Sequence, residues 1–246
     1  MNTGKLQLPN TSNWLSLYKI GGIAALVAGI IFRRNIGAEI LLFTGQTAPN
    51  TVADWFSLLQ SNSVLGLSLL NILDVVDYAL LGIMFLAMYV ALRRTNESYM
   101  AIATVTGLTG VAVYFASNTA FSMLSLGNQY AVAATEAQKS MLLAAGQSML
   151  AVGKGTGVYV SFLLLAVAGL AVSFVMLQSR VFGRKTAYLG MFAGVLDLPY
   201  SVTFAFVPEL DAVLLSVAGL SLMIWHIIVG RKLYKLSSSK QGMGVY

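Results

Sequence analysis

LSLLNILDVVDYALLGIMFLAMYVAL, residues 67–92, decides the fold class of this chain. It is apolar over more than the roughly 20 residues that a helix needs to cross about 30 Å of hydrocarbon. Two aspartates nevertheless lie inside it, Asp74 and Asp77, and a third, Asp197, lies in the apolar stretch TAYLGMFAGVLDLPYSVTFAF (residues 186–206). A carboxylate at such depth costs at least about 2.5 kcal/mol, so all three aspartates are candidate functional residues.

The composition indicates a polytopic membrane protein. Hydrophobic residues make up 57% of the 246 residues and charged residues 10%, with a mean hydropathy of +0.77. Soluble domains carry roughly 25% charged residues. The net charge of +6 does not indicate a nucleic-acid partner, because the basic residues recur at the ends of apolar runs rather than along one face. The absence of cysteine excludes disulfides, thiolate metal sites and redox motifs.

Apolar windows of membrane-spanning length predict an all-α fold with six transmembrane helices in a single domain, residues 1–246. A flexible cytoplasmic tail is expected at residues 237–246. The six predicted spans are Trp14–Phe32, Ser68–Leu92, Tyr99–Met123, Thr156–Leu177, Thr186–Val207 and Asp211–Gly230.

The distribution of lysine and arginine predicts that both termini are cytoplasmic. Eleven basic residues fall on the side of the termini and four on the other side, as the positive-inside rule requires. Arg33 and Arg34, directly after the first span, argue for the reverse orientation of that span. Either this span does not cross, leaving five crossings, or its helix continues through IFRRNIGAEILLF (residues 31–43) and carries both arginines into the membrane. The expected location is the plasma or inner membrane of a bacterium or archaeon.

Two segments between spans are expected to hold further helices. Strong helix formers in AVAATEAQKSMLLAAGQSMLAV (residues 131–152) predict an amphipathic helix before span four, packed on the outer face of the bundle. The loop before span two is expected to be irregular, with a short interfacial helix at Trp55–Leu59.

Polar residues gather in the outer half of the predicted bundle. At about 1.5 Å per residue, Asp77 lies about 24 Å from the cytoplasmic end of its span and Asp197 about 18 Å from the end of its own. The other candidate ligand residues are Asn71, Asp74, Tyr114 and Asn118, and the candidate ion-pair partners are Arg33, Arg34 and Lys154. Two hypotheses remain open: a structural ion-pair network, or an outward-open pocket for a small polar ligand or cation.

Three segments resemble a known family. They are LRRTNESYMAI (residues 92–102), AATEAQKSMLLAAGQSMLAV (133–152) and LQSRVFGRKTAYLGMFAGVL (177–196). Their order and spacing resemble a widespread bacterial and archaeal family of six-span membrane proteins classed only as a domain of unknown function. The resemblance implies the six-span fold and no reaction. This chain departs from the family in having Gly183 where proline is common, and no charged pair in span three.

The polar residues of the predicted bundle favour a non-catalytic membrane protein that serves as a binding, sensing or assembly module. The alternative is a small-solute or cation transporter or channel acting as an oligomer. An intramembrane enzyme is least favoured, because G-x-G-D and P-A-L protease patterns are absent and His226 is the only histidine. No catalytic residue, cofactor or metal site is predicted. The expected partners are the lipid bilayer and a second copy or another membrane protein.

Overall fold

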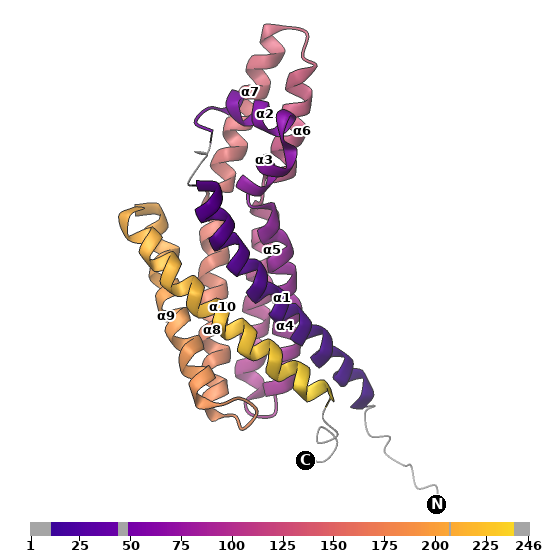
Figure 1. The fold of residues 1–246 in the computed structure, drawn as a ribbon, viewed down its shortest axis with the longest axis vertical. Helices are drawn as coiled ribbons and strands as arrows, with labels where there is room; N and C mark the ends of the chain where they lie inside the picture. The colour runs from indigo at the N-terminus through magenta and orange to yellow at the C-terminus, as the bar shows by residue number, and fades with distance from the viewer. Residues whose placement is uncertain (1–10, 44–48, 207, 239–246) are drawn as a thin grey trace, which may run out of the picture.

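Helices make up the regular structure of the part of the chain that the computed structural model describes (Figure 1). That part comprises the backbone of residues 11–43, 49–206 and 208–238, and the side chains of residues 14–31, 49–199 and 216–238. Six long helices form the bundle: α1 (Thr11–Phe43), α4 (Ile72–Leu92), α5 (Glu97–Ser117), α8 (Thr156–Gln178), α9 (Arg184–Phe206) and α10 (Pro208–Ser238). Four others lie beyond it: α2 (Val52–Ser61), α3 (Ser63–Leu69), α6 (Ala120–Ala131) and α7 (Glu136–Gly153).

The six long helices pack as a closed ring. Each contacts two neighbours in the order α1, α4, α5, α8, α9, α10, and α10 returns to α1. The helices therefore enclose a common interior. Near the loops that carry Arg93 and Arg180, this interior is filled by apolar side chains that include Met84, Met88 and Val172.

Glycines let α1 and α10 approach closely where the ring closes. A Cβ added at Gly22 would lie 2.7 Å from the backbone nitrogen of Tyr234, and one at Gly230 would lie 2.8 Å from the carbonyl oxygen of Gly22. Any side chain at either position would separate the two helices, since real Cβ atoms do not approach backbone so closely. Small residues at such contacts are typical of helices packed in membranes.

We call α2, α3, α6 and α7 together the head. It extends the bundle at one end, where α6 continues from α5 and α7 leads into α8 (Figure 1). The apolar stretches that contain these pairs cover 35 residues (Glu97–Ala131) and 43 residues (Glu136–Gln178). Because about 20 residues cross a bilayer, α6 and α7 must project beyond the hydrocarbon.

A small apolar core holds the head together. Phe56 of α2 is fully buried and contacts Gly127 of α6 and Gly146 of α7. Its ring centroid lies 5.4 Å from that of Tyr130. A capping box starts α7, in which the Thr135 hydroxyl accepts from the Gln138 backbone and the Gln138 side chain accepts from the Thr135 backbone. The head is thus a packed unit rather than a set of loops.

Three interruptions of the helical conformation separate the head from the bundle. They lie at Asn71, at Asn118–Thr119 and at Lys154–Gly155. The Asn118 side-chain amide donates to the carbonyl oxygens of Leu70 (3.4 Å) and Asn71 (3.2 Å). Ser117 contacts Gly157, and the Thr119 hydroxyl faces Gly153. These contacts join the three interruptions into one layer, which we call the junction.

The structure corrects several predicted boundaries. Span two was expected from Ser68, but Asn71 adopts a left-handed conformation (φ 59°) and α4 begins after it. Span three was expected to end at Met123, but Asn118 is extended and its side chain caps Ala120, so α5 ends at Ser117. The predicted helix before span four exists as α7. However, it packs mainly on α6, with smaller contacts to α2 and to the bundle helix α8.

The first and last helices are longer than predicted. The structure confirms that α1 continues through residues 31–43. Helix α10 extends to Ser238, so the first two residues of the predicted tail are helical and the remainder lies outside the described residues. The predicted interfacial helix is found as α2, and the supposedly irregular loop around it holds α3 as well.

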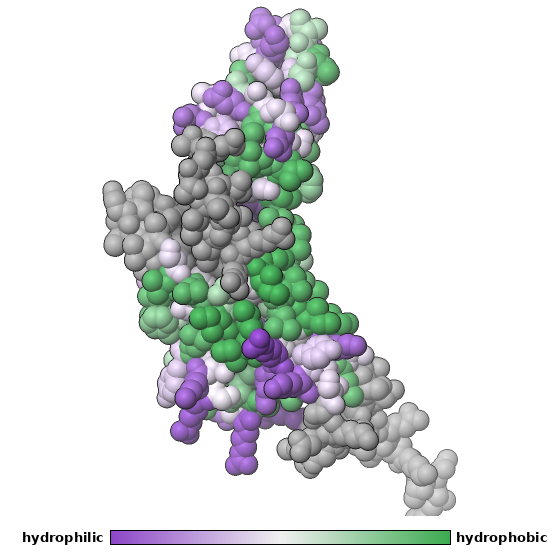
Figure 2. Space-filling view, viewed as in Figure 1, coloured by the Kyte–Doolittle hydropathy of each residue, from purple (hydrophilic) through white to green (hydrophobic). Residues whose placement is uncertain are grey.

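Five helical segments in the described part of the chain are long and apolar enough to cross a membrane. Two lie within α1 and α10, and the other three include α4, α5 and α8. The surface agrees with this. Figure 2 shows apolar side chains around the middle of the bundle and hydrophilic ones at both ends of the molecule. Exposed apolar residues on the long helices include Ile102, Val105 and Phe192. Large apolar side chains on so much of the bundle's outside fit a lipid environment.

Candidate functional site

The candidate site begins on the first two turns of α4, directly below the junction. Asp74 lies in the first turn, where the partial positive charge of a helix N-terminus favours a carboxylate. Asp77 follows one turn later and is only 4% exposed. It lies seven residues from Met84, two helical turns along, so both residues occupy nearly the same face of α4. Since Met84 belongs to the apolar core, Asp77 faces the interior of the ring.

Asp77 has an unsatisfied atom. Its Oδ1 is buried and has no hydrogen-bond partner in the part of the chain that the structure describes. A buried polar group without a partner costs about 1–3 kcal/mol, and more when the group is charged. Such a cost needs an explanation in function, because packing alone would favour an apolar residue here.

Tyrosines from α4 and α5 form the wall beside these carboxylates. The rings of Tyr78 and Tyr114 stack with their centroids 3.8 Å apart and an interplanar angle of 22°. The Tyr114 hydroxyl donates to Oδ2 of Asp74 at 3.1 Å. Tyr114 is 4% exposed, so this hydrogen bond is shielded from water and fixes the Asp74 carboxylate against α5.

Helix α9 brings the third aspartate to the same place. Asp197 lies seven residues from Gly190, whose Cα packs against Ser173 of α8 and Trp225 of α10. The two residues share a face of α9, and that face points into the ring. Tyr78 lies within electrostatic range of Asp74, Asp77 and Asp197. Asp74 and Asp77 thus lie on the same helix as Tyr78, and Asp197 approaches this tyrosine from α9 closely enough to act on it electrostatically.

The other predicted residues lie in different settings. Asn71 and Asn118 hold the junction through the hydrogen bonds described above. Lys154 is exposed at the end of α7. Arg33 and Arg34 lie on α1, but their side chains fall outside the described residues. Their pairing with Asp77 or Asp197 stays a prediction.

Sequence reasoning did not place Tyr78 at the centre of the site. The signal was its spacing: Tyr78 follows Asp74 by four residues, so the two share a helix face. A second polar group, in the basic half of the bundle, was also missed. His226 is buried there. Ser173 Oγ and Trp225 Nε1 are buried without hydrogen-bond partners among the described residues, and the two meet at Gly190.

The site is rich in hydrogen-bond acceptors. Ionised carboxylates only accept hydrogen bonds, and the Tyr114 hydroxyl already donates its proton to Asp74. An occupant that fits this set carries donors or positive charge. Among the described residues, no group of three or more histidine, aspartate or glutamate side chains is arranged to hold a metal ion.

The fold and surface define a multi-pass helical membrane protein. Within this class, the chain belongs to the family described as "Domain of unknown function (DUF4386)", which matches residues 16–230. The match covers the head and all of the ring except the first residues of α1 and the last residues of α10. No curated protein and no solved structure matches the chain.

Proposed function

We propose that this chain is a non-catalytic binding module of the plasma or inner membrane of a bacterium or archaeon, and that the aspartate–tyrosine cluster binds a small organic cation. In this proposal all six long helices cross the bilayer, with both termini in the cytoplasm and the head outside. Helix α9 completes the six, since it packs between α8 and α10 along the ring. The excess of lysine and arginine on the side of the termini supports this orientation.

The observation that carries the proposal is the buried Oδ1 of Asp77, which has no hydrogen-bond partner among the described side chains. A carboxylate that only held the fold together would be satisfied by a protein donor in the resting structure. Asp77 instead faces the ring interior next to Asp74 on α4, near a stacked tyrosine pair on which Asp197 also acts electrostatically. This arrangement suits an occupant that supplies the missing charge.

A protonated amine fits better than a metal ion. An ammonium group offers several N–H donors to the carboxylates and is attracted to the faces of aromatic rings. A divalent metal ion would need more oxygen ligands than the described side chains provide as a group. The position of the cluster directly below the junction brings it near the head side of the membrane, from which a ligand would enter.

The test is thermal unfolding of the purified protein in detergent with ethylammonium, tetramethylammonium, sodium or magnesium ions. Ethylammonium should stabilise the protein, by about 1.4 kcal/mol at ten times its Kd. Tetramethylammonium should act more weakly because it has no N–H donor. Asp77→Asn should abolish the effect. Glu97→Gln, the same acid-to-amide change at the other end of the bundle, should preserve it. Absence of stabilisation by any cation would refute the binding site.

The alternative function is transport of the same class of solute. The buried polar atoms of Ser173, Trp225 and His226 favour it, because they place polar groups in the basic half of the ring as well. Uptake of radiolabelled ethylamine into proteoliposomes separates the two functions. Saturable uptake that Asp77→Asn abolishes would establish transport. Binding without uptake would leave a sensing or assembly module, acting as an oligomer or with a membrane partner.

A further inference from the structure

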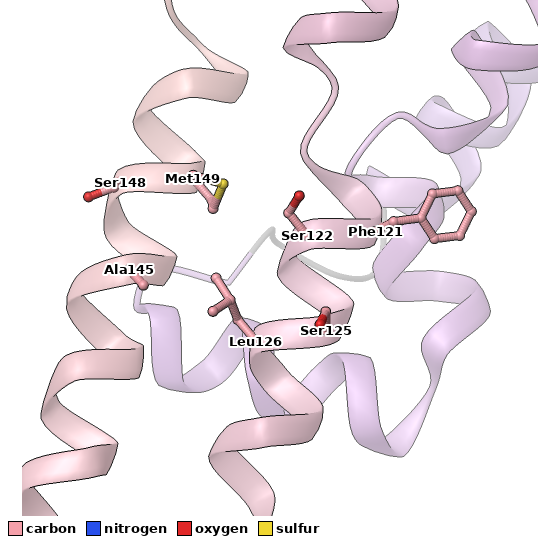
Figure 3. Close-up of a pocket in the computed structure, with 7 residues that line it drawn as sticks. All are labelled: Phe121, Ser122, Ser125, Leu126, Ala145, Ser148 and Met149. Atoms are coloured by element: carbon pink, nitrogen blue, oxygen red, sulfur yellow. The ribbon is translucent and has the colours of Figure 1, made fainter.

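The α6–α7 hairpin of the head has one covered face and one open face. On the covered face, α2 packs Val52 and Phe56 against Gly146, and Phe56 also contacts Gly127. On the open face, a groove of about 620 Å³ runs between the two helices (Figure 3). Four of its lining residues come from α6, namely Phe121, Ser122, Ser125 and Leu126, and three from α7, namely Ala145, Ser148 and Met149.

The groove combines apolar side chains with hydroxyls and carries no charge. Leu126 points into the space between the helices, whereas Phe121 points away from α7 at the rim (Figure 3). The Ser125 hydroxyl accepts from the Gln129 amide, so its own proton is available to a ligand. An amphipathic ligand with ester or phosphate oxygens matches this lining.

The groove lies at the membrane surface. Phe121 and Ser125 follow Thr119 of the junction by two and six residues, or about 3 and 9 Å along a helix. Met149 precedes Lys154 by five residues, about 8 Å. The polar headgroup layer is roughly 5–8 Å thick on each side of the hydrocarbon. The lower part of the groove is therefore level with the headgroups of the adjacent leaflet.

Apolar surface connects the groove to the bundle. Phe121 is 65% exposed, an unfavourable state for a large aromatic side chain in water. Figure 2 shows apolar surface continuing from the bundle onto the lower part of the head. Exposed apolar residues stand on both sides of the junction, with Phe115 on α5, Val152 on α7 and Val160 on α8. A molecule in the groove could thus extend into the bilayer without crossing water.

We propose that the α6–α7 groove is a phospholipid site, which holds the glycerophosphate part of one lipid while its acyl chains lie along the bundle. The serine hydroxyls donate to ester or phosphate oxygens, and Leu126 and Met149 pack against the apolar part of the glycerol backbone. This site is separate from the aspartate–tyrosine cluster and does not depend on the ligand proposed there.

The first test counts bound lipids by native mass spectrometry after adding dioleoylphosphatidylglycerol to the detergent-purified protein. Ala145→Phe fills the groove and should lower the occupancy of one bound lipid at least five-fold. Ala137→Phe makes the same change at an exposed position nearer the tip of the head and should leave all lipids bound. Circular dichroism of both variants checks that the head is folded. Equal lipid occupancy in the two folded variants would overturn the proposal.

The second test measures depth and uses the absence of native cysteine. Bimane attached at Ser125→Cys, in nanodiscs with headgroup-nitroxide phosphatidylcholine, should be quenched at least two-fold more than bimane at Ser140→Cys near the tip. Equal quenching at both positions would overturn the proposal. A dimer of the wild type that Ala145→Phe converts to monomer would also overturn it, because the groove would then contact a second copy.

Discussion

Replacing Asp77 by leucine should make this protein more stable. The two hypotheses for the aspartates give opposite signs for this change. A structural ion pair loses about 3–5 kcal/mol when one partner is removed, since the other charge is left buried and alone. A binding-site carboxylate without a partner already lowers the unfolding free energy, so its removal should raise it. The sign of the change in unfolding free energy therefore decides between the hypotheses.

The structure favours stabilisation. Asp77 is 4% exposed and its Oδ1 has no partner among the described residues, a state that costs about 1–3 kcal/mol. A leucine at this position faces the same interior as Met84 and adds apolar contact. We expect Asp77→Leu to gain about 2 kcal/mol, or roughly 4–8 °C in Tm for a chain of this length, and to lose all stabilisation by ethylammonium.

Equilibrium unfolding in mixed micelles, followed by circular dichroism, measures this change. Met84→Ala is the control for sensitivity, because truncating a buried methionine should cost about 2–5 kcal/mol. A folded Asp77→Leu variant that is less stable than the wild type by 1 kcal/mol or more would refute the reasoning. It would show that Asp77 is paired, for which Arg33 and Arg34 are the candidates.

Three further predictions test the packing of the bundle, the head and the junction. Gly190→Ala should cost about 1–3 kcal/mol in thermal unfolding, because its Cβ would meet Ser173 and Trp225; Gly183→Ala, with open space around it, should cost much less. Phe56→Ala should lower the unfolding free energy of the head by about 3–5 kcal/mol. It should therefore speed tryptic cleavage at Lys139, and unchanged cleavage would show that α2 does not hold the α6–α7 hairpin. Asn118→Ala should remove about 1–3 kcal/mol from the junction and accelerate hydrogen exchange in α6; equal exchange rates would contradict this.

The sequence predicted the bundle well because the bilayer imposes one strong rule. A helix must be apolar for about 20 residues, and this requirement is visible in composition alone. The head was harder to predict because its helices resemble the spans in hydropathy. The apolar run from Glu97 continues through Ala131, and only the backbone at Asn118 divides it into α5 and α6. The Asn118 side chain caps Ala120 locally, and its amide also donates to residues 47 and 48 positions away, which no local pattern records.

The aspartates could be found from sequence because they are charged residues in apolar runs, and the same property makes them unfavourable in a membrane helix. Any charge within an apolar run stands out, and depth along each helix placed Asp77 and Asp197 in the same half of the bundle. Their common neighbour could not be found this way, because a tyrosine in a membrane helix is ordinary in composition. Tyr78 gains its importance from the order of helices around the ring, which brings α4, α5 and α9 to one interior.

The junction links the two proposed sites. Asn118 joins the start of α4 to the end of α5, and Tyr114, one turn before Asn118, holds Asp74. A displacement of α6 relative to α5 would therefore move Asn118, the first turn of α4 and the Asp74–Tyr114 hydrogen bond together. The contacts of Ser117 with Gly157 and of Thr119 with Gly153 extend this connection to α7 and α8. One continuous set of contacts therefore joins the head to the carboxylates below it.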